Sequence, residues 1–541
     1  METISEQSFG KTNSINTDAS GKRSALGRVV FSLSVIAVFT KIFGFAEKLV
    51  IAHFFGTDVA ADVYFASMGV VLSVVFLVKE LIYPSLLPVF AESLPGPRHS
   101  SAILFRKIFL LAAVALAIFS LCLAVFSDIC AGLIVPGFSD DKKHLTSIML
   151  KLLSPGCFFL SLCTITYTVL NSRRKFLKAA FPEAGLKLFI VAGLIVLVPF
   201  IGVYALALVL TLGAATVFLV QLYFVPESRE LFKTAAIKAG GEFNKFLKLM
   251  GPLVIGVVFS HISGLVDNVL ASLLPTGHLS YLGYSKKLIN AILLVGPVAL
   301  VTVVYSQLAH ISTLKTKDEF RKLFTRALRF ILYVSVPAAL LLVALREPFV
   351  QILFERGRFT AQSTLGTSNA LFVYGIGLVT FSLESLVVYS FYALSNTKVP
   401  VKAGILCVFV DIILAVSFVR PFGYMGIAWA FVISKTIKVV ILFAVLEKHL
   451  GFLYNSKLLG FLSRLAAATI LPSFTLHLLC KIENQSSLIR RAVFDLAVPA
   501  AGFVSVFIIF SYLLKIRELR ELAEFIFHRK TFKYQLAGEK V

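Results

Sequence analysis

Charged side chains are scarce in this chain of 541 residues. Asp, Glu, Lys and Arg make up 15% of the sequence, where a soluble domain carries about 25%, and the mean hydropathy is +0.89. These values exclude an ordinary water-soluble globular protein. We therefore expect an integral membrane protein.

Sequence patterns of enzymes and metal sites are also missing. The six cysteines never occur as CxxC, so we expect neither a zinc site nor a disulfide framework. No Walker loop, HExxH, GxSxG or nucleotide-binding fingerprint occurs, and the loops are too short for an ATPase domain. We expect a protein that is not an enzyme and has no cofactor, and whose energy comes from Na⁺, the membrane potential or substrate flux.

Long apolar runs are what the sequence has instead. At roughly 17 to 25 residues per membrane span, we predict fourteen transmembrane helices. Their continuous apolar character excludes the alternating strands of a membrane barrel and predicts an all-α protein. The predicted segments are 29–53, 63–90, 103–127, 146–170, 179–199, 202–224, 247–273, 283–308, 325–345, 367–394, 401–419, 424–446, 458–480 and 492–514.

The net charge of +23 follows from membrane topology and not from nucleic-acid binding, because Lys and Arg interrupt the apolar runs at regular intervals. Most of these cations fall in alternate loops, which predicts cytoplasmic loops there and both termini in the cytoplasm. Residues 1–27 lack the apolar core of a cleavable signal, and we expect a disordered cytoplasmic tail. The tail 516–541 is either solvated or forms an amphipathic surface helix through Leu519, Leu522, Phe525 and Ile526.

An internal repeat divides the apolar region. Residues 38–49 align without gaps on 258–269, at an offset of 220, and residues 170–179 resemble 394–403 at an offset of 224. Six predicted helices separate the copies, so both halves enter the membrane in the same direction, as in carriers with parallel repeats. We predict an N-terminal lobe over 28–225, a C-terminal lobe over 226–450 and two appended helices over 451–515.

Ionisable side chains inside the first two spans are candidates for function, because they are costly at membrane depth unless they are paired or face water. In helix 1, Lys41 and Lys48 lie about 20° apart around the axis, with Gly44 on the same stripe. Glu47 either lines the same cavity or pairs with a lysine. In helix 2 the candidates are Asp62, Lys79 and Glu80, with a helix-terminal charge or an interfacial position as the alternative reading.

The second half supplies further intramembrane charges. Lys286 and Lys287 stand early in helix 8, and lysines on two lobes suit an anion such as diphosphate. Asp267 and Asp411 are candidates for a coupling cation such as Na⁺ or for a proton, although Asp411 could instead pair with a lysine of helix 12. No bound structural metal is expected.

Several of these segments resemble the MurJ/MviN family of lipid II flippases, in the multidrug/oligosaccharidyl-lipid/polysaccharide exporter superfamily. The resemblance runs from about residue 28 to 450, and its most specific stretch is Leu353 to Thr360. The other matching stretches are 41–45, 54–56, 61–65, 136–138, 170–172, 284–288, 391–394 and 400–402.

The resemblance implies a carrier of the bacterial inner membrane that binds lipid II, an undecaprenyl-diphosphate precursor, in a cationic cavity between the lobes. Family arginines correspond to Lys41 and Lys287, and Asp62 keeps an acidic position. Where the family has Arg-Asp in helix 1 this chain has Glu47-Lys48, and its helix-2 arginine pair is replaced near residues 75–76. Lysine lacks the bidentate fork of arginine, so diphosphate would be held with looser geometry.

The resemblance assigns roles and partners to these residues. Lys41, Lys48 and Lys287 would hold the diphosphate, while Asp62 and Glu80 would order the lysines or respond to closure. Asp267 and Asp411 match a sodium site of some members. Helices 13 and 14 would form a groove for the lipid tail. We expect a monomer that contacts membrane lipids and the cell-wall synthesis machinery, and no nucleic acid.

Three other functions remain open from the sequence. A flippase for another polyprenyl-diphosphate-linked oligosaccharide would share the lobes and the cationic cavity. A cation-coupled multidrug exporter would favour an acidic, aromatic cavity, which the lysines argue against. A membrane scaffold without transport would leave the buried charges unexplained.

Overall fold

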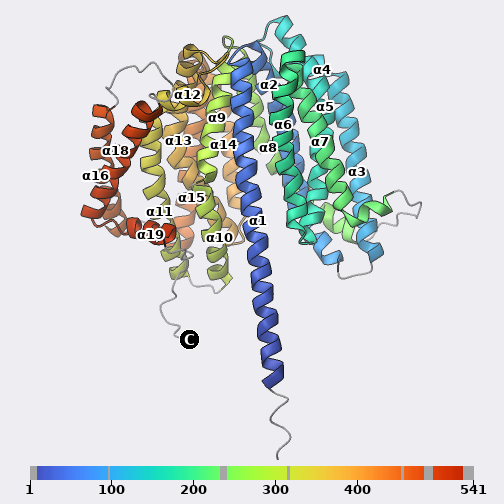
Figure 1. Ribbon diagram of the computed structural model, residues 1–541, viewed down its shortest axis with the longest axis horizontal. Helices are drawn as coiled ribbons and strands as arrows, with labels where there is room; N and C mark the ends of the chain where they lie inside the picture. Colours follow the sequence, from blue (N-terminus) through green and yellow to red (C-terminus); the bar gives the residue numbers. More distant parts are fainter. Residues whose placement is uncertain are drawn as a thin grey trace, which may run out of the picture. The chain divides into compact units, whose positions relative to one another are not determined.

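The structure of the chain is a computed structural model, and its elements are all helices (Figure 1). It describes residues 9–94, 98–231, 241–295, 297–313, 317–451, 456–479 and 492–527. In these ranges no strand occurs, because an apolar run in lipid satisfies its backbone polar groups only within a helix or a closed barrel. Ten of the described helices are long and apolar enough to cross a membrane, or up to eleven if the bent pair within 241–272 is one span. The prediction of an all-helical membrane protein is confirmed.

The first half contains seven α-helices and a short 3₁₀ helix. Its elements are α1 (Phe9–Phe55), α2 (Val59–Ser93), α3 (Arg98–Val125), α4 (Ser127–Ile134), α5 (Asp140–Ser172), α6 (Phe176–Ile201), α7 (Tyr204–Phe224) and η1 (Pro226–Glu230). The short elements α4 and η1 join longer helices and were not predicted.

The second half continues with helices of the same kind. Its elements are α8 (Gly241–Ser272), α9 (His278–Val295), α10 (Pro297–Thr313), α11 (Lys317–Ala344), α12 (Arg346–Phe354), α13 (Ala361–Ala393), α14 (Lys398–Phe422), α15 (Tyr424–Leu450), α16 (Ser456–Leu479), the π-helical turn η2 (Ala492–Ala497), α18 (Val498–Leu513) and α19 (Arg517–Phe527).

Three of these elements differ in extent from the predicted segments. Helix α1 begins at Phe9, within the predicted tail 1–27, because backbone hydrogen bonds extend the apolar helix into a polar sequence. The segment 283–308 is divided into α9 and α10, and Pro297 takes the first position of α10, where its missing N–H breaks no bond. Of the two readings of the C-terminal tail, the structure has the helix, α19. Residues 1–8, 452–455, 480–491 and 528–541, which complete several predicted segments, lie outside the described residues.

The chain forms two compact units that differ from a simple division into halves. Unit 1 comprises residues 1–50, 71–127 and 148–254, and unit 2 comprises 51–70, 128–147 and 255–541. Unit 2 therefore includes two segments of the first half of the sequence. The predicted lobe boundaries at residues 225 and 450 stay a prediction.

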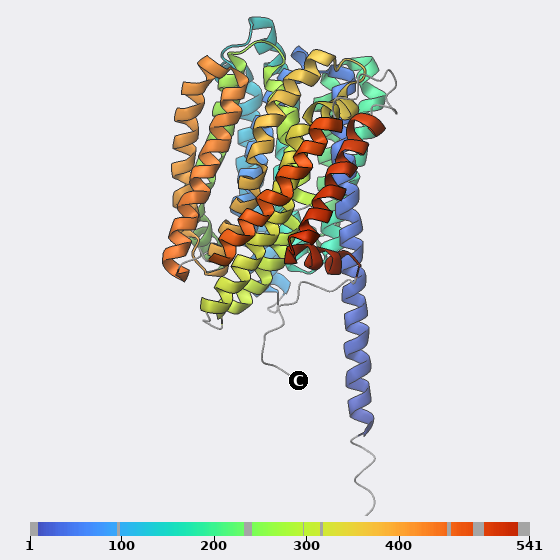
Figure 2. The same ribbon diagram turned by 90° about the vertical axis from the view of Figure 1, so that its left-hand side faces the viewer.

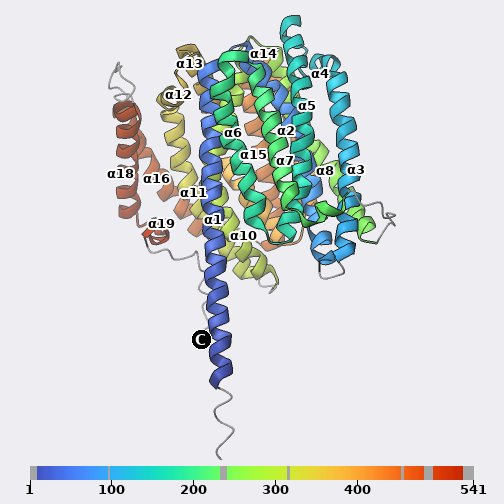
Figure 3. The ribbon, with the colours of Figure 1, turned by 45° about the vertical axis from the view of Figure 1, so that its right-hand side comes forward.

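Unit 1 packs through aromatic and small side chains. Phe109 stacks on Phe218 with ring centroids 6.1 Å apart, inside a cluster of buried apolar residues from α2, α3, α5 and α7. Helices α6 and α7 run side by side (Figure 3). A Cβ on Gly193 would lie 2.7 Å from the Val209 side chain, so the glycine permits this approach. Close backbone packing is a main source of helix association in lipid.

Unit 2 has a larger apolar core, formed by α10, α11, α13, α15, α16 and α18. Within this unit α14 and α15 form a hairpin, seen as the orange pair in Figure 2. Helix α19 adds Leu519 and Leu522 to the edge of the core, and its Glu518 pairs with Arg329 of α11 at 2.7 Å. These contacts attach α19 to the helices of unit 2.

The internal repeat is visible in the backbone turns. Arg174 and Ser395 have φ values of 58° and 57°, and Gly202 and Gly423 have 58° and 57°. Both pairs are about 220 residues apart, at an offset of 221. The predicted offset of 224 for the first turn was therefore wrong by three residues, because it matched side-chain types and not the backbone turn.

Candidate functional site

The predicted charges of helix 1 meet a lysine of α6 in unit 1. The Glu47 carboxylate is 4% exposed and accepts hydrogen bonds from Lys48 Nζ at 2.6 Å and from Lys187 Nζ at 2.8 Å. A Cβ on Gly44 would lie 3.9 Å from the Lys187 side chain, so this stripe of α1 faces a neighbouring helix. Glu47 is therefore an organiser of lysines, the alternative that the sequence left open.

The other candidates of unit 1 are more exposed. Lys41 is exposed on α1, one turn before Gly44. On α2, Lys79 lies over the Tyr167 ring with its Nζ 5.7 Å from the centroid, and Glu80 is exposed. The cation–π contact orients Lys79 toward α5.

The carboxylate of Asp62 in α2 accepts hydrogen bonds from the N-terminal end of α9. Asp62 and α9 both belong to unit 2. The Asp62 carboxylate accepts from the backbone N–H of Gly277 at 2.7 Å and of Ser280 at 2.9 Å, and from Ser280 Oγ at 2.6 Å. Asp62 is 1% exposed. Free N–H groups and a positive dipole at a helix N-terminus favour a carboxylate, so Asp62 caps a helix that is distant in sequence. The hydrogen-bond donors to Asp62 in the described part of the chain thus come from Gly277 and Ser280 and not from the predicted lysines.

Further contacts surround this cap within unit 2. Tyr284 Oη donates to Gly56 O at 2.9 Å, and Arg358 N–H donates to His53 O at 2.9 Å. The Gly137 N–H donates to Ser272 Oγ at 3.2 Å, and a Cβ on this glycine would lie 2.5 Å from backbone atoms of the chain after α8. These contacts were not predicted, although Gly56, Gly137 and Arg358 all lie in segments that carry the family resemblance.

The two candidate coupling-ion carboxylates have different partners. Asp267 of α8 pairs with Lys286 of α9 at 2.7 Å, and the Lys286 ammonium lies 5.1 Å from the centre of the Phe431 ring. Asp411 of α14 accepts hydrogen bonds from Ser263 and, at 3.1 Å, from Ser434. In the described residues no group of three or more His, Cys, Asp or Glu could hold a metal ion.

The lysines of the twelfth predicted span, which is α15 in the structure, pair with a different acid. Lys435 and Lys438 of α15 both bind Glu384 of α13, at 3.0 Å and 2.6 Å. The alternative pairing of Asp411 with these lysines is therefore wrong, because both lysines pair with Glu384 and the Asp411 carboxylate accepts from Ser263 and Ser434. Lys287 is half-buried on α9.

These features define a class of protein: an all-helical membrane protein with a twofold repeat and charge networks buried within its spans. The family model for lipid II flippase MurJ matches residues 51–493, and the chain belongs to this family.

Curated relatives agree over most of the chain. A probable lipid II flippase MurJ from Haemophilus influenzae is 28% identical, covering 80% of this chain and 89% of its own. The lipid II flippase MurJ of Burkholderia cenocepacia is 25% identical, covering 88% and 95%.

Solved structures show the same fold. A lipid II flippase MurJ in an inward closed conformation aligns with a TM-score of 0.77 at 24% identity, covering 91% of this chain and 100% of its own. An inward-facing multidrug resistance transporter of the MATE family, in the MOP superfamily, aligns with a TM-score of 0.64 at 13% identity, covering 76% and 95%.

Proposed function

We propose that this chain flips lipid II from the inner to the outer leaflet of the bacterial cytoplasmic membrane, without covalent chemistry. The family match over residues 51–493 carries the proposal, and relatives named lipid II flippase cover most of the chain. The buried charges at span depth fit a carrier of a polar headgroup, since ionisable residues inside spans are costly and commonly mark substrate or ion pathways.

The proposed topology has fourteen spans, two six-helix lobes, two appended helices and both termini in the cytoplasm. Helices lie at each of the fourteen predicted segments, which supports this count. The concentration of Lys and Arg in alternate loops supports the orientation.

The proposed headgroup site uses Lys41, Lys48 and Lys287 for the diphosphate. Glu47 pairs with Lys48 and Lys187 and orients both side chains on the N-terminal side of this site. Lys79 and Glu80 extend the polar surface of α2. Lys286 is not assigned to the diphosphate, because its ammonium pairs with Asp267.

Alternating access requires that the Asp62 cap open during each cycle. In the proposed orientation, residues 51–70 and 128–147 are the outer ends of first-half helices, and unit 2 holds them against the second half of the chain. Exposing the headgroup outside then means breaking the bonds of Asp62 with Gly277 and Ser280. In the proposed cycle, the Asp62 cap therefore keeps the outer side closed until its hydrogen bonds break.

The energy source of the proposed cycle is a cation gradient or the membrane potential. Asp267 and Asp411 are the proposed ligands for Na⁺ or a proton, with Ser263 and Ser434 as oxygen neighbours. A cation that binds Asp267 has to displace the Lys286 ammonium.

Complementation tests the function. The chain is expressed in a bacterium depleted of its own lipid II flippase, beside Lys41→Ala and a matched variant of an exposed lysine near the start of α14, Lys402→Ala, with membrane levels measured for each. We expect wild type and Lys402→Ala to restore growth and Lys41→Ala to fail. Failure of well-inserted wild type would contradict the assignment of lipid II.

A further inference from the structure

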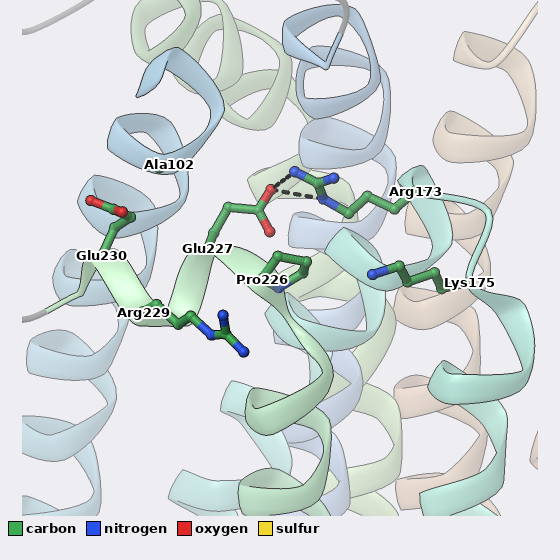
Figure 4. Close-up of a pocket in the computed structure, with 7 residues that line it drawn as sticks. All are labelled: Ala102, Arg173, Lys175, Pro226, Glu227, Arg229 and Glu230. Atoms are coloured by element: carbon green, nitrogen blue, oxygen red, sulfur yellow. Dashed lines mark hydrogen bonds and ion pairs between the residues drawn. The ribbon is translucent and has the colours of Figure 1, made fainter. Parts of the chain in front are cut away.

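A polar cavity of about 640 Å³ lies in unit 1, and its lining includes none of the residues of the proposed transport site. Figure 4 shows its lining. The turn between α5 and α6 contributes two cations, and η1 contributes most of the remaining wall. The lining residues are Ala102, Arg173, Lys175, Pro226, Glu227, Arg229 and Glu230. In the proposed topology this cavity opens at the cytoplasmic side.

One wall of the cavity is fixed by a buried ion pair. Arg173 Nε donates to Glu227 Oε1 at 2.7 Å, its Nη2 bonds to the same oxygen, and Glu227 is 3% exposed. The second carboxylate oxygen, Glu227 Oε2, is buried and has no hydrogen-bond partner among the described residues. A buried carboxylate oxygen without a donor is costly, so a ligand that brings a hydrogen-bond donor into the cavity would be stabilised there.

Two cations converge on the cavity without a carboxylate of their own. Lys175 and Arg229 extend toward each other in Figure 4, from either side of Pro226, while the Glu230 carboxylate points away from both. Neither cation forms an ion pair within the described ranges. Burial lowers the pKa of Lys175, and so do the charges of Lys178 and Arg173, against the opposing effect of Glu227. A bound anion would relieve this repulsion.

The turn itself does not require these cations. In the first half, Lys175 N–H donates to Leu170 O at 2.8 Å, and in the second half Asn396 N–H donates to Phe391 O at 2.9 Å. The matching turn in the second half thus has a neutral residue at the position of Lys175. The cation at this position is therefore specific to the first of the two turns.

An apolar surface begins beside the cavity. Tyr223 and Leu219, in the last two turns of α7 before η1, are 82% and 60% exposed. Tyrosine at the end of a span is typical of the lipid headgroup level, and exposed leucine there suits an acyl chain. A ligand with a phosphate and an acyl chain would meet both surfaces.

We propose that this cavity binds the phosphate group of a membrane phospholipid whose headgroup also carries a donor, such as phosphatidylglycerol or phosphatidylethanolamine. Lys175 and Arg229 hold the phosphate through charge-assisted bonds, and Glu227 Oε2 accepts from the headgroup hydroxyl or ammonium. The bound lipid joins the α5–α6 turn to η1. This site is separate from the proposed transport of lipid II and does not depend on it.

Binding to the purified full-length chain in delipidated detergent micelles tests the proposal. Native mass spectrometry measures the affinity for phosphatidylglycerol, phosphatidylethanolamine, phosphatidylcholine and inorganic phosphate. We compare wild type with Lys175→Gln/Arg229→Gln and with Lys398→Gln/Lys402→Gln, a control that removes the same charge from the start of α14, directly after the matching turn. Phosphatidylglycerol and phosphatidylethanolamine are expected to bind wild type and the control at least tenfold more tightly than the cavity variant.

Phosphatidylcholine, which lacks a headgroup donor, should bind at least tenfold more weakly than phosphatidylglycerol. Inorganic phosphate binding as tightly as the lipids would retain the phosphate site and assign it to a soluble ligand. Equal lipid binding by wild type and the cavity variant, or equal loss in the control, would overturn the proposal. The charge-conserving variant Lys175→Arg/Arg229→Lys should keep binding, which separates lost recognition from misfolding.

Discussion

Replacing Asp62 by asparagine removes the charge of the distant helix cap with little change of shape. Asparagine keeps one oxygen acceptor and puts an amide N–H where the second oxygen accepts from Gly277 N–H at 2.7 Å. Two donors then face each other in a buried position, and the bonds from Ser280 lose their charge assistance. Charge-assisted bonds contribute about 1.5 to 3 kcal/mol each, so we expect a loss of about 3 kcal/mol.

A loss of this size favours opening of the cap about 100-fold. Hydrogen–deuterium exchange of the chain in lipid nanodiscs measures this opening. The amides of Gly277 and Ser280 exchange only when their hydrogen bonds to Asp62 are broken. The matched control is Asp58→Asn, the same change one turn earlier at an exposed side chain. Unchanged exchange at both amides in Asp62→Asn, or equal acceleration in Asp58→Asn, would refute the capping role.

Other substitutions test the remaining charges and close contacts. Lys287→Ala should abolish complementation while the protein is inserted, and normal growth would remove Lys287 from the site. Glu47→Gln leaves two lysines without their shared acid and should lower stability by about 3 kcal/mol, measured by thermal unfolding against the less buried Glu80→Gln. Gly137→Ala forces a Cβ to within 2.5 Å of backbone and should cost about 1 to 3 kcal/mol; an unchanged melting temperature would show that the contact is absent. Lys286→Met frees the acid it occupies, so Na⁺ should stabilise this variant more than wild type, and indifference to Na⁺ would count against the coupling-ion proposal.

The helices were predictable because their signal is local. An apolar run such as 179–199 identifies α6 by itself, since lipid leaves the backbone few other solutions. The division of the segment 283–308 at Pro297 could not be predicted from the apolar run alone, because proline within a span can bend a helix or begin a new one. The short helices α4 and α12 have no such signal, as eight or nine residues cannot cross a membrane.

The site residues were predictable as charges but not as partners. Helix geometry placed Lys41 and Lys48 on one stripe, yet the acid Glu47 binds Lys187, which lies 140 residues further along the chain. Asp62 could be recognised as a helix-terminal charge, but it caps a different helix, 215 residues from Gly277. Such pairings depend on how helices pack, and the periodicity of a single segment carries no information about that.

Transport of lipid II by the purified chain is the central claim, and reconstitution measures it most directly. The chain is placed in liposomes with a fluorescent lipid II, and a membrane-impermeant quencher reports how fast the headgroup crosses the bilayer. We expect crossing well above the rate in protein-free liposomes, and a marked loss in Lys41→Ala at equal protein incorporation. Crossing no faster than in protein-free liposomes, by a well-folded wild type supplied with a Na⁺ gradient and a membrane potential, would contradict the account.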